Sequence, residues 1–171
     1  THLIPSGILS KTTSILGDGV VIDLSDLISE IEGLEKMDIN IADHLHISDR
    51  AQLVMPWHKI IDLISEKKKG KNKIGTTGRG IGPTYADKSQ RNGIRIRDLL
   101  NEDRLRDVLE IPLKEKNGLL KKIYGIEPLC KDEIIEEYLD YGHRLSKHVV
   151  DCTRTIHSAA KNKKNILFEG A

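Results

Sequence analysis

The sequence predicts an α/β fold that is rich in helix. Short apolar runs with β-branched residues alternate with longer stretches whose apolar residues recur at helical spacing. The 171 residues are 38% hydrophobic and 31% charged, which is typical of a globular domain and not of a long disordered chain. One segment, residues 74–83, holds four glycines and one proline and interrupts the alternation.

The first half of the chain contains two expected strands and two expected helices. Residues 20–22 are apolar and β-branched, which indicates a buried strand. A helix is expected over 24–34, with Asp23 or Ser25 as its N-cap. Alternation predicts a short strand at residues 44–47. Helical spacing then runs from 51 to 67, and Pro56 must lie in the first turns of that helix or bend it.

The second half is expected to be mainly helical. Apolar spacing predicts one helix over 98–116 and a longer one over 132–160. Gly142 lies inside the longer pattern, where it would allow a close approach or a bend. A polar break at 162–165 precedes a strand-like run at 166–168. The segment 74–83 fits neither an ordinary helix nor a strand, because it is so rich in glycine and proline.

The glycine-rich segment 74–83 is the first candidate for binding a ligand. Phosphate needs several donors that converge without steric interference, and glycine N–H groups can supply them. Thr76 and Thr77 add hydroxyl groups, and Arg79 adds a guanidinium that matches phosphate or carboxylate oxygens. A flexible surface loop is the alternative, since the spacing matches neither the P-loop nor the GxGxxG pattern.

Basic residues flank this segment on both sides. Lys88 and Arg91 are three residues apart and would share one face of a helical turn, so with Arg79 they could bind an anion. A solvated basic surface is the alternative. The basic run 67–73 contains no aromatic residue, so a solvated helix end is expected there and not a nucleic-acid patch. A net charge of +1 predicts no general attraction to nucleic acid or anionic membranes.

The histidines and cysteines predict neither a metal site nor a disulfide. His44 and His46 would lie on one side of a strand, but no further ligands cluster with them, so surface or partly packed side chains are expected. Cys130 and Cys152 do not form a CxxC pair, and Cys152 lies on an apolar stripe as a core residue would. A reducing cytoplasm is therefore expected. No apolar run reaches the roughly 18 residues of a membrane-spanning helix.

Residues 75–91 closely resemble the adenylosuccinate synthetase family. The core of the family signature, GI[GR]PxYxxKxxR, is met from Gly80 to Arg91 without a departure. Three other similar stretches are residues 2–9, 17–21 and 168–171. The resemblance implies that residues 1–171 are a fragment of a large, mostly parallel sheet with flanking helices. It also implies that they form the middle part of a single domain, truncated at both ends.

The resemblance implies a function in purine (AMP) biosynthesis. The family joins IMP and L-aspartate into adenylosuccinate at the expense of GTP, with Mg²⁺, and phosphorylates the IMP 6-oxygen before aspartate displaces that phosphate. By this resemblance Thr77 would hold the IMP 5′-phosphate with Thr76 beside it, and Arg79 would assist substrate recognition. Lys88 matches the signature lysine assigned to the active site. Arg91 would reach the IMP of the neighbouring subunit, which implies a homodimer with shared active sites.

Other motifs of the family are absent from this sequence. They are the GDEGKGK loop, the NAGHT segment, the KxD guanine-binding element and the arginine-rich aspartate loop. The resemblance therefore implies that the GTP and Mg²⁺ ligands lie outside this chain, and that residues 1–171 alone have no synthetase activity. Two alternatives stay open, namely a nonenzymatic module that binds anions or nucleic acid and a module that only mediates dimerisation.

Overall fold

The strands pair in parallel in the computed structural model, which describes residues 2–70 and 75–170. One sheet has the order β1-β3-β5, and a second pairs β2 with β4. The strands are β1 (Ser14–Leu16), β2 (Val21–Ile22), β3 (Leu45–Ser48), β4 (Gln52–Leu53) and β5 (Val149–Val150). Ile15 lies opposite His46 in the first sheet, and Ile22 lies opposite Leu53 in the second. The predicted α/β class is confirmed.

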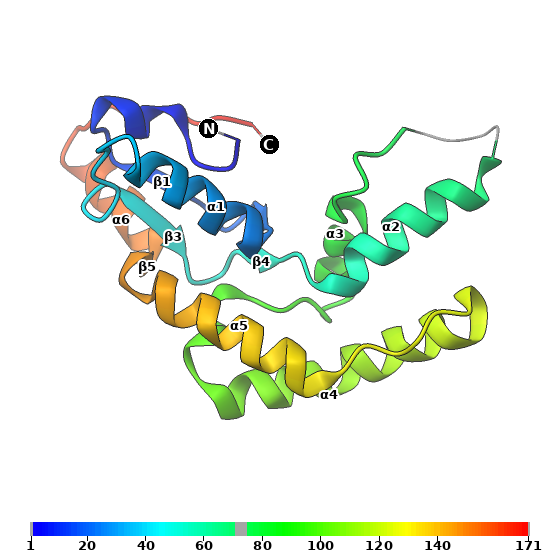
Figure 1. Cartoon of the computed structure of the whole chain (residues 1–171). Coiled ribbons are helices and arrows are strands. Elements are labelled where there is room, and N and C mark those ends of the chain that lie inside the picture. The colour runs from blue at the N-terminus through cyan, green and yellow to red at the C-terminus, as the bar shows by residue number, and fades with distance from the viewer. Residues whose placement is uncertain (1, 71–74, 171) are drawn as a thin grey trace.

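Helices make up most of the described chain. The α-helices are α1 (Leu24–Glu35), α2 (Pro56–Lys68), α3 (Ile81–Ser89), α4 (Glu102–Leu119), α5 (Lys131–Leu145) and α6 (Cys152–Lys161). Short 3₁₀ turns are η1 (Ser6–Ser10), η3 (Ile96–Leu100) and η5 (Ser146–His148), and η4 (Leu120–Tyr124) is π-helical. Figure 1 shows α2 and α3 together at one end of the molecule, away from β1, β3 and α6.

The helix α1 forms as its sequence predicts. Its leucines and isoleucines at helical spacing are buried in the core, and Asp23 caps its first turn. The Asp23 Oδ1 atom accepts hydrogen bonds from the N–H groups of Ser25, at 3.2 Å, and Asp26, at 3.5 Å. These bonds satisfy backbone donors that have no partner inside the helix.

Three expected helices have different limits in the structure. The pattern over 98–116 divides into η3, which ends at Leu100, and α4, which begins at Glu102 after the extended Asn101. The helix predicted over 51–67 begins only at Pro56, because the residues before it form β4. Proline suits the first helical position, where its missing N–H is not needed. The pattern over 132–160 is interrupted, since α5 ends at Leu145 and β5 pairs with β3 before α6 begins. Its apolar spacing continues across the break because residues on both sides of the break are buried.

Two further expectations need correction. Residues 166–168 form no strand in the described part of the chain, and Leu167 is 84% exposed. Such β-branched and apolar runs are stabilised by packing on a neighbouring strand, which the described residues do not provide here. The segment 74–83 was expected to contain no helix, yet α3 begins at Ile81. Pro83 lies in the first turn of α3, where it removes no intrahelical hydrogen bond.

The core joins the second half of the chain to the strands. Tyr138 of α5 donates a hydrogen bond from its hydroxyl to the Val54 carbonyl, at 2.9 Å. Gly142 provides the close approach that its position predicts, because a Cβ there would lie 2.6 Å from the Leu99 carbonyl oxygen. Among residues 2–70 and 75–170, no helix has the length and apolar character needed to cross a membrane.

Candidate functional site

The glycine-rich loop, residues 75–80, leads into α3 and lies against one face of α2. The Gly75 N–H donates to Glu66 Oε2 at 3.0 Å, and the Gly80 N–H donates to Asp62 Oδ2 at 2.9 Å. Between these bonds Gly78 packs so closely on α2 that an added Cβ would lie 2.7 Å from Leu63 Cδ2. Carboxylates of α2 thus anchor the loop at both ends.

These anchors change the expected role of the loop glycines. The N–H groups of Gly75 and Gly80 are bound to carboxylates of the protein itself, so they are not offered to a ligand. A hydrogen bond from Lys69 is the main cause that lowers the pKa of Glu66, and the Gly75 and Thr76 amides lower it further. The exposed groups left for an anion are therefore mainly side chains of the loop.

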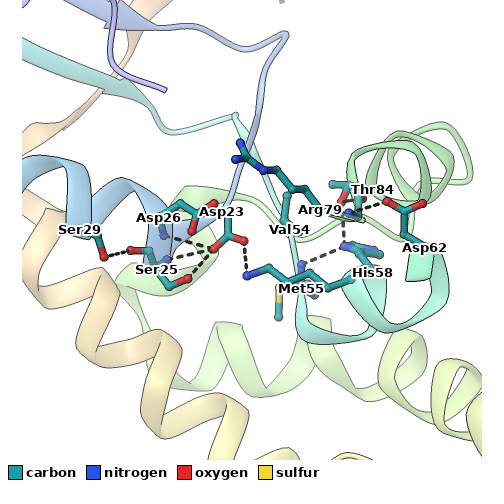
Figure 2. A network of polar contacts seen from close by, with 12 residues as sticks. Asp23, Ser25, Asp26, Ser29, Val54, Met55, His58, Asp62, Arg79 and Thr84 are labelled. Atoms are coloured by element: carbon teal, nitrogen blue, oxygen red, sulfur yellow. Dashed lines mark hydrogen bonds and ion pairs between the residues drawn. The ribbon is translucent and has the colours of Figure 1, made fainter. Parts of the chain in front are cut away.

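Gly80 has a backbone conformation that requires glycine. Its φ is 79°, and it is the N-cap of α3. An added Cβ would lie 2.8 Å from both the His58 carbonyl carbon and the Lys59 nitrogen. The Gly80 carbonyl accepts a 2.7 Å hydrogen bond from the Thr84 hydroxyl. Figure 2 shows Thr84 and His58 next to each other, with Asp62 on the adjoining turn of α2.

A buried polar network around His58 supports this end of the loop. The Met55 N–H donates to His58 Nδ1 at 2.9 Å, so the ring proton is on Nε2. Nε2 then donates to Asp87 Oδ2 of α3, also at 2.9 Å. The second Asp87 oxygen accepts a 2.5 Å bond from Lys116 of α4. The network therefore ties the first turn of α2 to both α3 and α4.

The pKa values of this network fit a neutral histidine and an ionised carboxyl group. Burial lowers the pKa of His58 below its ordinary value, and the charge and hydrogen bond of Asp87 do not reverse that effect. Burial by itself would raise the pKa of Asp87. The hydrogen bonds from His58 and Lys116 outweigh this effect, so the Asp87 pKa lies below its usual value.

The threonines and the arginine predicted for the site lie in the exposed part of the loop. Thr76, Thr77 and Arg79 are all exposed. The Arg79 guanidinium contacts the His2 imidazole, and its side chain points away from Asp62 and His58 (Figure 2). Arg79 also shares a shallow depression with Asp26 and Ser29 of α1. The loop therefore presents two exposed threonines with hydroxyl groups and one exposed cation.

Lys88 and Arg91 do not share a helical face, so that prediction is wrong. Lys88 lies in the last turn of α3, with Nζ 3.4 Å from the Asp18 carbonyl oxygen and 5.6 Å from the Tyr85 ring centre. Arg91 lies beyond the helix at φ 64° and is exposed. Within the described residues no contact joins either cation to Thr77 or Arg79. A single chain does not assemble the expected cluster, because α3 separates its parts.

Sequence reasoning missed the residues of α2 that hold the loop. His58, Asp62 and Glu66 are spaced four residues apart, which places them on one face of a helix. That spacing was a usable signal for a polar face. Asp87 and Lys116 gave no comparable signal, because Asp87 meets His58 and Lys116 only in the folded chain.

The structure describes most of the remaining histidines, cysteines and lysines singled out in the sequence. His44 and His46 are half-buried, and the described residues hold no group of three or more His, Cys, Asp or Glu side chains suited to a metal ion. Cys152 is buried in the core, and burial raises the pKa of its thiol to about 12. Lys67 and Lys68 end α2 as exposed side chains, and the rest of the basic run includes residues 71–73, outside the described part.

Comparisons with known proteins agree on one family over the whole chain. The family model for adenylosuccinate synthetase matches residues 1–171. Adenylosuccinate synthetases from Prochlorococcus marinus strains MIT 9515 and MED4 are each 71% identical over 171 residues, which is 99% of this chain and 39% of each relative. The solved structure of fully ligated adenylosuccinate synthetase from Plasmodium falciparum has a TM-score of 0.85 at 33% identity. It covers 100% of this chain, which spans 39% of that protein.

Proposed function

This chain belongs to the adenylosuccinate synthetase family, and from that premise we propose that its glycine-rich loop binds the 5′-phosphate of IMP. The observation that carries the proposal is the anchoring of the loop. Asp62 and Glu66 hold its two ends, while Thr76, Thr77 and Arg79 between them stay exposed. A loop that is already fixed loses less conformational entropy when its ligand binds.

Both hydroxyl and guanidinium groups of the loop would bind the phosphate. Thr77 donates a hydrogen bond from its hydroxyl to a phosphate oxygen, and Thr76 adds a second donor. Arg79 supplies a positive charge that reaches phosphate or carboxylate oxygens. In this proposal Arg79 recognises a second substrate group, such as a carboxylate of L-aspartate, and its exposure beside α1 supports that role.

Arg91 acts on the site of a neighbouring subunit in this proposal. It is exposed, and in the described part of the chain it makes no contact with Thr77. A homodimer with shared active sites would bring the guanidinium of one subunit to the IMP phosphate of the other. Lys88 acts in its own subunit, where its ammonium group lies 3.4 Å from the Asp18 carbonyl oxygen.

The complete protein would join IMP and L-aspartate into adenylosuccinate, in the cytoplasm, with GTP as the source of the phosphoryl group. Magnesium would supply charge stabilisation of the transferred phosphoryl group when bound. The described residues contain no suitable set of metal ligands, so no step is assigned to metal in this chain. What this chain contributes is the binding and orientation of IMP.

Substitution of Arg91 in the complete protein tests whether this residue binds the IMP of the neighbouring subunit. Arg91→Leu is expected to weaken IMP binding about 10- to 100-fold, because a charge-assisted hydrogen bond to phosphate is lost. GTP binding should stay nearly unchanged. Arg97→Leu, which removes an exposed arginine of η3, is the matched control. Equal loss of IMP and GTP affinity would contradict the assignment, and calorimetry measures both.

Mixed subunits test the shared site itself. Thr77→Val and Arg91→Leu should each lose most of the activity measured at an IMP concentration that just saturates the unsubstituted protein, since each removes a phosphate contact. In hybrid dimers one site carries both lesions and the other carries neither, so random mixing should restore about a quarter of the sites. No recovery on mixing would show that Arg91 acts within its own subunit.

Salt-sensitive binding to unrelated DNA without any effect of IMP would instead favour a nucleic-acid module.

A further inference from the structure

We propose that Asp62 is a positioning residue for substrate binding, because it fixes the Gly80 peptide from which the glycine-rich loop and α3 both extend. This inference rests on the proposed function of the loop and assigns a role to a residue outside the family signature. Asp62 acts together with His58 and Thr84, and we call these three residues the Gly80 clamp.

The first half of the clamp is a buried ionic hydrogen bond. Asp62 is 7% exposed, and its Oδ2 atom accepts the Gly80 N–H at 2.9 Å. A carboxylate beside an anion-binding loop repels the anion, so Asp62 is unsuited to contact phosphate itself. Asp62 instead fixes the orientation of the Gly80 peptide in the loop backbone.

The second half of the clamp holds the carbonyl group of Gly80. The Thr84 hydroxyl donates to the Gly80 carbonyl at 2.7 Å and lies 2.9 Å from His58 Nδ1. Thr84 and His58 are both buried, and the His58 ring is itself fixed by Met55 and Asp87. Both hydrogen-bonding groups of Gly80 are therefore held by side chains of α2 and α3.

Fixing Gly80 determines the direction of the chain on both sides. Arg79 comes immediately before it, and the first turn of α3 comes immediately after it. A Cβ at Gly80 would meet the α2 backbone at 2.8 Å, so the peptide is seated directly on α2. Without the Asp62 carboxylate the loop would sample other directions, and IMP binding would have to order it.

The test compares two substitutions of Asp62 in a complete adenylosuccinate synthetase that contains this segment. Asp62→Ala removes the acceptor for the Gly80 N–H. It is expected to weaken IMP binding about 10- to 100-fold, as loss of an ionic hydrogen bond does, with GTP affinity nearly unchanged. Asp62→Asn keeps an oxygen acceptor and removes the charge, so IMP binding should stay within about threefold of the unsubstituted protein. Asp107→Ala, an exposed change on α4, is the matched control.

Hydrogen exchange of the free protein gives a readout that does not depend on IMP. In Asp62→Ala the amides of residues 75–80 should exchange faster, while those of α4 and α5 keep their rates. Unchanged IMP affinity and unchanged loop exchange in Asp62→Ala would overturn the inference, as would equal losses in Asp62→Asn and Asp62→Ala. If the unsubstituted protein binds no IMP, the proposed function fails. Faster loop exchange in Asp62→Ala would then still support the clamp, and unchanged exchange would overturn it.

Discussion

Replacing Asp87 with alanine is expected to lower the free energy of unfolding by about 3–5 kcal/mol, the usual effect of removing one partner of a buried ion pair. Asp87 is 1% exposed and accepts hydrogen bonds from His58 at 2.9 Å and Lys116 at 2.5 Å. Its removal leaves the Lys116 ammonium, whose side chain is 16% exposed, without its partner. The His58 Nε2–H loses its acceptor as well, and so does the Trp57 Nε1–H, which lies 3.4 Å from Asp87 Oδ2, so three donors are left without this carboxylate.

Urea denaturation of the complete protein measures this loss. The double change Asp87→Leu with Lys116→Met removes both charges and should recover a large part of the stability, since apolar residues of similar size can replace an ion pair. Asp103→Ala, an exposed carboxylate at the start of α4, should change the stability by less than about 0.5 kcal/mol. A loss below about 1 kcal/mol for Asp87→Ala would contradict the role given to this network.

The second large effect is expected for Gly80→Ala. The left-handed conformation at φ 79° costs a residue with a Cβ about 1–2 kcal/mol. The added atom would also lie 2.8 Å from the α2 backbone, which is too close for a carbon contact. Relief of that contact must move the loop away from Asp62. We expect IMP binding to weaken by more than about tenfold, together with a lower melting temperature.

Gly33→Ala is the matched control for this change. Gly33 lies in α1, and an added Cβ there meets nothing within 4 Å. Because alanine favours helix over glycine, this variant should be stabilised by up to about 1 kcal/mol. Binding of IMP by Gly80→Ala with normal affinity would show that the loop tolerates movement at this point.

Local signals in the sequence were enough to predict much of the fold. The start of α1 followed from Asp23 and the apolar spacing after it, because a helix cap acts within one turn. The break between Leu145 and Cys152 did not follow, since β5 exists only by pairing with β3, which is distant in the chain. The same holds for β4, whose partner is β2. Pairing between distant segments is not encoded in local periodicity.

In the candidate site, too, local chemistry could be predicted from the sequence and contacts between distant residues could not. The chemistry of Thr77 and Arg79 identified an exposed loop with groups suited to phosphate, and the structure places both residues there. The glycine-rich sequence predicts free amides, whereas α2 carboxylates bind those of Gly75 and Gly80. A sequence names donors without showing which acceptors they meet in the fold. The spacing of Asp62 and Glu66 indicated a polar helix face but not its partner.

A crystal structure of the complete protein with bound IMP tests the central claim most directly. The claim is that the anchored loop holds the IMP 5′-phosphate between its two fixed ends. We expect a phosphate oxygen within about 3.2 Å of the Thr77 hydroxyl, with the Gly80 N–H still bonded to Asp62. A phosphate bound elsewhere, with residues 75–80 turned away from it, would contradict the claim.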